Sequence, residues 1–340
     1  METTLQNISI AVILCFAFVN GFHDGGNVLA TAVCSRSVSP VRALLVAASA
    51  EFAGPLILGT AVAQTIAANI LNLELLEELT PARIQVTLIS AAAGAIIWKL
   101  PSWYWGFPSS GSHALVGGLV GAGYMAIGIA GIEYRSILLW VILPMLVAPI
   151  IGMVFGFLVF GLIRTAAENA HRSIGRVFAR LQSPTMAFLA ASHGSNDAQK
   201  SMGLIALAMM GGSGELHGEL IMAPWVAVAC AAALACGLTV GAWRIVKSVG
   251  QGICRMQPVH SFASQATAMS VILTASLLGG PVSTTQVVAS SVMGVGAAER
   301  LGAVRWNSAS NIAYAWLLTV PVSALLGALI FVGLVKLIPV

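Results

Sequence analysis

Apolar stretches long enough to cross a membrane recur along this chain. Residues 137–163 and 224–243 contain no charged side chain, and residues 312–337 contain only Lys336. A helix needs about 20 residues to cross the hydrocarbon core of a bilayer, so each stretch is long enough. Because 58% of the residues are apolar and 8% are charged, the chain lacks the polar side chains that cover a soluble domain. These continuous runs predict an all-α integral membrane protein rather than a barrel of alternating strands.

Two polar motifs occur twice in the chain. Residues 193–200 (HGSNDAQK) echo residues 20–27 (NGFHDGGN), and residues 281–286 (PVSTTQ) echo residues 108–113 (PSSGSH). The offset is the same for both pairs, because 193 minus 20 and 281 minus 108 each give 173. One offset shared by two unrelated motifs predicts a duplicated chain whose polar sites come in pairs.

The charged residues suggest how the two halves cross the membrane. If each half contributes five membrane segments, one side receives twelve of the sixteen Lys and Arg residues. They are Arg36, Arg42, Lys99, Arg164, Arg172, Arg176, Arg180, Arg244, Lys247, Arg255, Arg300 and Arg305. Since basic residues favour the cytoplasmic side, both termini are expected outside the cytoplasm. Five is an odd number, so the two repeats are predicted to be inverted.

The expected organisation is a first repeat at 1–163, an amphipathic cytoplasmic linker at 164–183 and a second repeat at 184–340. Basic residues of the linker would lie near anionic lipid. Inverted repeats are frequent in secondary transporters, where broken helices form a site near the midplane. Four short runs are compatible with re-entrant half-helices instead of full crossings: 84–100, 113–131, 262–279 and 283–297.

Ionisable residues inside the apolar runs are candidates for function. A charge at the bilayer centre costs at least ~2.5 kcal/mol and persists mainly where it is paired or used. Asp24, Asp197, Lys200 and Glu51 meet this description, although Glu51 has no evident partner in the sequence. A buried polar cluster that only fixes helix packing is the alternative.

Glycines surround the first of these aspartates. Gly21, Gly25 and Gly26 weaken a helix and let backbone approach a ligand closely, so a helix break is predicted around Asp24. The aromatic cluster at 98–105, which includes Lys99, is expected at a membrane boundary, where amphipathic rings commonly anchor.

The two Pro-Ser blocks have the composition of helix starts. Proline is tolerated in the first turn, hydroxyl groups cap the unpaired amides, and the positive end of the helix dipole favours an anion. Two such ends that converge from inverted repeats would hold an anion without any arginine. Ordinary capping is the alternative, but the repetition in both halves favours an anion site.

These motifs resemble the signature of the inorganic phosphate transporter (PiT) family, which has the form Gly-x-Asn-Asp-x-x-Asn in each half, followed by Pro-Val-Ser-Thr-Thr-His. The resemblance covers nearly the whole chain and looks closest to the compact bacterial branch of low-affinity phosphate permeases. It implies one phosphate site between inverted repeats, aspartates and asparagines that coordinate or relay a coupling cation, and a homodimer. The expected partners are inorganic phosphate and membrane lipid, with no nucleic acid and no cofactor.

The chain departs from the family pattern at several positions. Gly111 stands where many members have a hydroxyl residue, Gln286 replaces a histidine, and Gly25 and Gly26 precede Asn27. The most consequential departure is Lys200, which occupies the position equivalent to Asn27.

Lys200 bears on the identity of the coupling ion. It follows Asp197 by three residues, so its ammonium group can contact that carboxylate from the same helix face. It could replace a second sodium ion, or contact phosphate as a point charge. Proton coupling through Asp24 or Asp197 is therefore favoured. With sodium coupling, Asp24, Asn27 and Asp197 would be ligands.

The predicted site has two parts. The predicted phosphate-binding residues are Ser110, Gly111, Ser112, Lys200, Ser283, Thr284 and Thr285. The predicted coupling-ion residues are His23, Asp24, Asn27, Asn196 and Asp197.

The resulting hypothesis is a secondary-active phosphate symporter, with phosphate carried alone or as a metal complex. A sulfate permease of the same family is a rival. An intramembrane aspartyl protease is disfavoured because its Gly-x-Gly-Asp signature is absent and because it leaves the Pro-Ser blocks unexplained. A passive anion channel is the third alternative. Accumulation against a gradient would exclude the last two.

Overall fold

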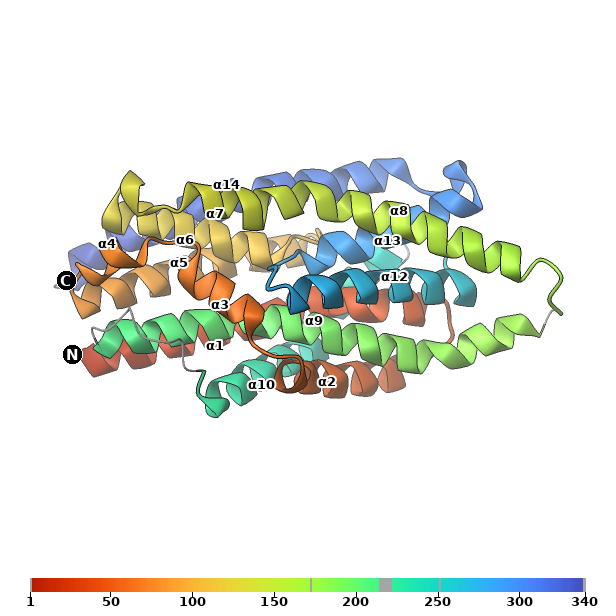
Figure 1. Ribbon diagram of the computed structural model, residues 1–340, viewed down its shortest axis with the longest axis horizontal. Coiled ribbons are helices and arrows are strands. Elements are labelled where there is room, and N and C mark those ends of the chain that lie inside the picture. Colours follow the sequence, from red (N-terminus) through yellow and green to blue (C-terminus); the bar gives the residue numbers. More distant parts are fainter. Residues whose placement is uncertain (1, 172, 214–221, 251, 339–340) are drawn as a thin grey trace.

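The computed structural model describes residues 2–171, 173–213, 222–250 and 252–338. These residues are almost entirely helical, and six of their helices are long and apolar enough to cross a membrane. The helices run along the long axis of the molecule, and α1 begins at the same end at which α14 ends (Figure 1). The predicted all-α integral membrane fold is confirmed.

The first half contains α1 (Glu2–Cys34), α2 (Pro40–Ile57), α3 (Ala61–Ala68), α4 (Leu73–Glu77), α5 (Pro81–Tyr104), α6 (Gly111–Ile127), α7 (Tyr134–Ile137) and α8 (Leu143–Ala166). A π-helical turn, Leu138–Ile142, joins α7 to α8. The second half contains α9 (Ile174–Ser213), α10 (Pro224–Gly241), α11 (Trp243–Gly250), α12 (Pro258–Leu277), α13 (Thr284–Glu299) and α14 (Trp306–Leu337). Helices α2, α5, α10 and α12 start with proline, which is pre-organised for the first turn.

Two helical hairpins reach the middle of the molecule from opposite ends (Figure 1). Helices α5 and α6 lie toward the end where α1 begins, and α12 and α13 lie toward the other end. The side chain of Ser110 caps α6 and that of Ser283 caps α13, by accepting hydrogen bonds from the backbone of His113 and Gln286. The four short apolar runs therefore form hairpins that return to their own end.

Each hairpin packs against the last long helix of the other half. Helix α6 lies against α14, and α13 lies against α8. A Cβ atom on Gly121 would overlap the backbone of Ala324, and one on Gly294 would overlap the backbone of Met153. The pairs α1 with α10 and α2 with α9 cross between the halves in the same way. Glycine thus allows the close helix contacts that bring the hairpins to the centre.

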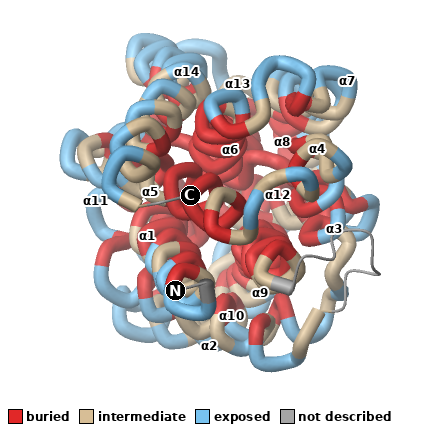
Figure 2. The backbone as a smooth tube through the Cα atoms, turned by 90° about the vertical axis from the view of Figure 1, so that its left-hand side faces the viewer, coloured by how far each residue is buried: buried red, intermediate tan, exposed pale blue. Residues whose placement is uncertain are grey.

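Burial separates the hairpins from the outer helices. Figure 2 shows buried residues concentrated in the interior, around α6 and α13, with exposed residues around the rim. In the most apolar 18-residue stretch of each helix, 67% of the residues of α5 are buried. The corresponding values are 17% for the continuous helical segment α7–α8 and 22% for α14. The apolar side chains that α8 and α14 leave exposed are the surface expected to face lipid.

The predicted helix break around Asp24 is wrong, because α1 continues without interruption from Glu2 to Cys34. Its glycines have a packing role instead. A Cβ on Gly21 would overlap the backbone of Leu234, and one on Gly25 would overlap the side chain of Leu238, both on α10. These positions are glycine because a side chain would block the contact with α10. They do not form a turn, so the helix continues.

The expected separate linker at 164–183 is not an independent helix. Helix α8 ends at Ala166, and α9 begins at Ile174 and continues as one helix of 40 residues through the second aspartate motif. Arg176 and Arg180 lie exposed on the first turns of α9, whereas Arg172 lies outside the described residues, as do Glu215 and Glu219.

Candidate functional site

The two hairpin tips meet helices α1 and α9 in the middle of the molecule. This junction contains all of the predicted site residues, and none of their side chains is more than 3% exposed. They are His23, Asp24, Asn27, Ser110, Gly111, Ser112, Asn196, Asp197, Lys200, Ser283, Thr284 and Thr285. The structure therefore brings residues from both halves into one closed polar site.

Asp24 is held by groups from four elements. Its Oδ2 accepts a hydrogen bond from Lys99 Nζ at 2.8 Å and from the backbone N–H of Gly111 at 3.2 Å. Its Oδ1 lies 2.7 Å from His23 Nδ1 and accepts from Thr285 Oγ1 at 3.2 Å. The carboxylate thus links α1 to both hairpins.

Asp197 has a matching environment on α9. Its Oδ1 accepts from Lys200 Nζ at 2.6 Å, and its Oδ2 accepts from Asn20 Nδ2 at 2.9 Å. Thr284 Oγ1 donates to the same Oδ2 at 3.5 Å, a long bond. Each aspartate therefore pairs with a buried lysine, as the spacing of Lys200 predicted for Asp197.

The starts of α6 and α13 line the centre of the site. Ser112 Oγ, in the first turn of α6, donates to the carbonyl oxygen of Val282 at 2.9 Å, so the two tips are in direct contact. Asn27 Nδ2 donates to Thr285 Oγ1 at 2.9 Å, while Asn27 Oδ1 has no hydrogen-bond partner. Two helix starts with free backbone N–H groups and hydroxyl side chains can bind an anion.

Gly111 explains how α6 comes so close to α1. A Cβ at this position would overlap the side-chain oxygen of Asn20 and crowd the carboxylate of Asp24. The hydroxyl residue that the family pattern suggests here would not fit unless α6 moved or the Asn20 side chain turned away. The departure in sequence thus allows the backbone N–H of Gly111 to reach Asp24.

His23 and Asn196, at equivalent positions in the two motifs, hold the two hairpin loops. His23 Nε2 lies 3.1 Å from the carbonyl oxygen of Phe107. Asn196 Nδ2 donates to the carbonyl oxygen of Gly280 at 3.1 Å and to Ser276 Oγ at 2.9 Å. Both side chains thus contact a hairpin, and His23 Nδ1 also lies 2.7 Å from Asp24 Oδ1. Their role at a coupling ion stays a prediction.

Lys99 was missed as a site residue, because its expected position in a basic loop is wrong. Its side chain has no exposed surface, and Nζ contacts Asn20 Oδ1 and Asp24 Oδ2 at 2.8 Å each. Among the neighbouring aromatic residues, the Trp103 ring packs 4.4 Å from that of Phe22, whereas Tyr104 and Trp105 are exposed. Their expected place at a membrane boundary stays a prediction. The only signal in the sequence is a lone lysine at the end of an apolar run.

Glu51 has a partner on α9 that the sequence could not reveal. Its Oε1 lies 2.6 Å from His193 Nδ1, and His193 Nε2 lies 3.3 Å from Asp197 Oδ2. Glu51 Oε2 has no hydrogen-bond partner. Glu51 is therefore connected to the site through His193.

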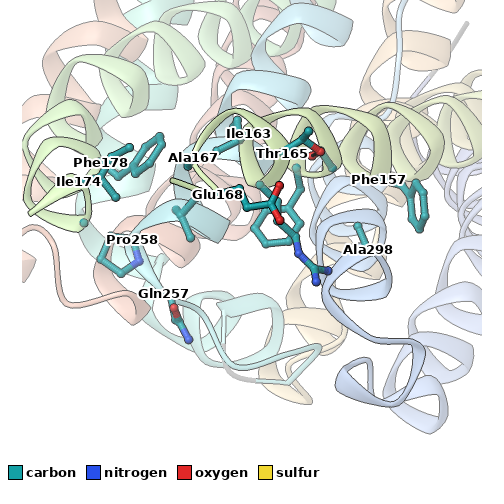
Figure 3. Close-up of a pocket in the computed structure, with 15 residues that line it drawn as sticks. Phe157, Ile163, Thr165, Ala167, Glu168, Ile174, Phe178, Gln257, Pro258 and Ala298 are labelled. Carbon is teal, nitrogen blue, oxygen red and sulfur yellow. Dashed lines mark hydrogen bonds between the residues drawn. The ribbon is translucent and has the colours of Figure 1, made fainter. Parts of the chain in front are cut away.

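One cavity lies outside this site. It has a volume of about 830 Å³. Its lining residues, which include Phe157, Glu168 and Gln257, come from α8, α9, α12, α13 and the connections beside them (Figure 3). It contains none of the residues at the hairpin tips. Among the described residues, no group of three or more His, Cys, Asp or Glu side chains is arranged to hold a metal ion.

Comparison with known proteins agrees with this arrangement. The sequence matches the phosphate transporter family over residues 20–175 and 164–327. A probable low-affinity inorganic phosphate transporter of Bacillus subtilis (strain 168) is 36% identical over 329 residues, which are 95% of this chain and 96% of that protein. One of Rhizobium meliloti (strain 1021) is 37% identical over 324 residues, 95% and 94% of the two chains.

A solved structure has the same fold. It is described as "The sodium-dependent phosphate transporter", with a TM-score of 0.88 and 26% sequence identity, covering 98% of this chain and 100% of that one. The predicted resemblance is confirmed, and the family and these relatives are transporters rather than enzymes. This multi-pass membrane protein is therefore a phosphate transporter and belongs to the phosphate transporter family.

Proposed function

We propose that the chain is a secondary-active, proton-coupled phosphate symporter that works by alternating access. The observation that carries this proposal is the meeting of two capped helix starts, α6 and α13, with two lysine-paired aspartates in a closed central site. A site at the meeting point of two halves can open to either side when one part moves against the rest.

Phosphate fits the chemistry of the site better than sulfate does. Backbone N–H groups at the helix starts and the hydroxyls of Ser112, Thr284 and Thr285 are donors for its oxygens. Monohydrogen phosphate also has a proton to donate, and the carboxylates of Asp24 and Asp197 can accept it. Sulfate has no such proton at neutral pH, so it would leave these acceptors unused.

The buried lysines favour a proton over sodium as the coupling ion. Phosphate that enters between the hairpin tips competes with Asp197 for the ammonium group of Lys200, which lies 2.6 Å from the carboxylate. A carboxylate that loses its ammonium partner in a buried site can restore its charge balance by taking a proton. Phosphate binding and proton binding would then occur together. The structural relative's sodium dependence makes sodium coupling the alternative.

The proposed orientation places the arginine-rich end in the cytoplasm. Arg36 follows the end of α1, Arg255 and Arg305 lie in connections at that end, and Arg176 lies at the start of α9. Basic connections favour the cytoplasmic side of the inner membrane, so both termini would lie outside the cytoplasm.

We also propose that the protein forms a homodimer and that α8 and α14 contact lipid. Labelling a terminal cysteine tag in intact cells and chemical cross-linking in vesicles test these points.

Uptake of labelled phosphate into proteoliposomes tests the function. A proton gradient alone should drive accumulation above the external concentration, and a sodium gradient alone should not. Unlabelled sulfate in excess should leave uptake unchanged. Omission of divalent cations tests whether a metal–phosphate complex is carried. Equal accumulation with a sodium gradient at constant pH would contradict proton coupling, and equilibration without accumulation would contradict symport.

A further inference from the structure

Two lysines without exposed surface are the most unusual feature of the transport site. Lys99 and Lys200 are among the largest fully buried side chains in the molecule. A buried ammonium group is unfavourable unless it is paired with a carboxylate and hydrogen-bonded. Both lysines meet these conditions because each is paired with one of the two aspartates. They therefore belong to the polar site and not to the apolar core.

Lys99 fills a position with the properties of a cation site. Its Nζ lies 2.8 Å from the amide oxygen of Asn20 and 2.8 Å from a carboxylate oxygen of Asp24. Carboxylate and amide oxygens are the ligands that hard cations prefer. The amide nitrogen of the same Asn20 donates to Asp197, which fixes the direction of its oxygen toward Lys99.

Lys200 fills a second such position. Its Nζ lies 2.6 Å from a carboxylate oxygen of Asp197 and 3.3 Å from the carbonyl oxygen of Val282, at the tip of the second hairpin. The equivalent residue in the first half, Asn27, places no positive charge there and keeps its side-chain oxygen free of hydrogen bonds. The first half instead receives its positive charge from Lys99 on α5.

We propose that Lys99 and Lys200 are built-in counter-cations, which fill the cation positions beside Asp24 and Asp197 and make transport independent of sodium. This inference rests on the proposed phosphate transport. A cation attached to the protein neutralises the aspartates in the closed site but cannot leave with the substrate. The two lysines therefore supply charge compensation without adding cations to the transport stoichiometry, and the driving force must come from another ion.

Replacing either lysine with a neutral oxygen-bearing residue tests the inference. Lys200→Asn introduces the residue found at the equivalent position of the first half, and Lys99→Asn makes the same change at the second cation position. Lys247→Asn, at an exposed lysine of α11, is the control. Thermal stability in detergent is compared in sodium chloride and choline chloride at equal ionic strength. Phosphate uptake under a fixed proton gradient is compared in the same two salts.

The wild type and Lys247→Asn should melt at the same temperature in both salts, with uptake rates that differ by less than about twofold. In Lys99→Asn and Lys200→Asn, sodium should raise the melting temperature and stimulate uptake by at least about fivefold, the lower end of typical site coupling. Folded variants that show no response to sodium would overturn the inference.

The wild type alone also decides the question if the variants do not fold. Stabilisation of the wild type by sodium, or uptake that requires sodium, would show that the cation positions are not filled by lysine. The melting comparison does not depend on transport, so a failure of the lysine assignment can be told apart from a failure of phosphate uptake.

Discussion

Replacement of Gly111 by alanine should impair transport, although alanine is a good helix former at this position. Gly111 is the first residue of α6, and its N–H lies 3.2 Å from the carboxylate of Asp24. An added Cβ would overlap the side-chain oxygen of Asn20, which accepts a hydrogen bond from Lys99. Either α6 must move away from α1, or Asn20 must turn and release Lys99.

Movement of α6 and rotation of Asn20 would cost similar free energies. Overpacking a tight contact costs typically 1–3 kcal/mol, and loss of a hydrogen bond to a charged group costs about 1.5–3 kcal/mol. A central figure of about 2 kcal/mol corresponds to roughly a thirtyfold lower population of the competent site, since about 1.4 kcal/mol is a factor of ten. The initial rate of phosphate uptake should therefore fall by roughly thirtyfold, together with a lower melting temperature.

A second glycine provides the control for this experiment. Gly333 lies in α14, and a Cβ there would meet no other atom within 4 Å. Gly333→Ala should keep the uptake rate and melting temperature of the wild type. If Gly111→Ala also transports at the wild-type rate, the close approach of α6 to Asn20 and Asp24 does not exist in the functional protein.

Three further outcomes are expected. Asp24→Asn and Asp197→Asn should each abolish accumulation of phosphate and lower the melting temperature, because removing one partner of a buried ion pair costs about 3–5 kcal/mol; retention of accumulation by either variant would contradict its role. Glu51→Gln should reduce uptake at least about tenfold by weakening the 2.6 Å contact with His193, whereas an unchanged rate would make Glu51 purely structural. Gly25→Val should lower the melting temperature by separating α1 from α10, which a thermal melt beside Gly333→Ala would detect.

The helical membrane fold and the presence of two equivalent polar motifs could be predicted from local sequence patterns. Helix formation in lipid depends on continuous apolar length, so composition and run length were sufficient for the fold class. The duplicated motifs at residues 20–27 and 193–200 indicated which polar residues matter, because charged side chains are rare at membrane depth. The capping role of the serines at the starts of α6 and α13 could also be predicted locally, because every helix start leaves backbone N–H groups without partners.

Other features depended on which helices pack together. The glycines around Asp24 have the composition of a break, but the neighbouring helix α10 makes use of the space they leave. Lys99 looked like a loop residue because it stands at the end of an apolar run, but α5 continues to Tyr104 and carries this lysine to Asp24. The partner of Glu51 lies 142 residues away on α9, a distance over which no local pattern operates.

The sequence by itself determined that the chain is a helical membrane protein with two matched aspartate motifs and two helix starts suited to an anion. Only the tertiary structure decided that these four elements meet at one point and that Asp24 is paired with Lys99 from α5. The physical reason is that hydropathy and capping are properties of a few neighbouring residues. Charge pairing between different helices instead depends on long-range packing, which here is shaped by close glycine contacts between helices.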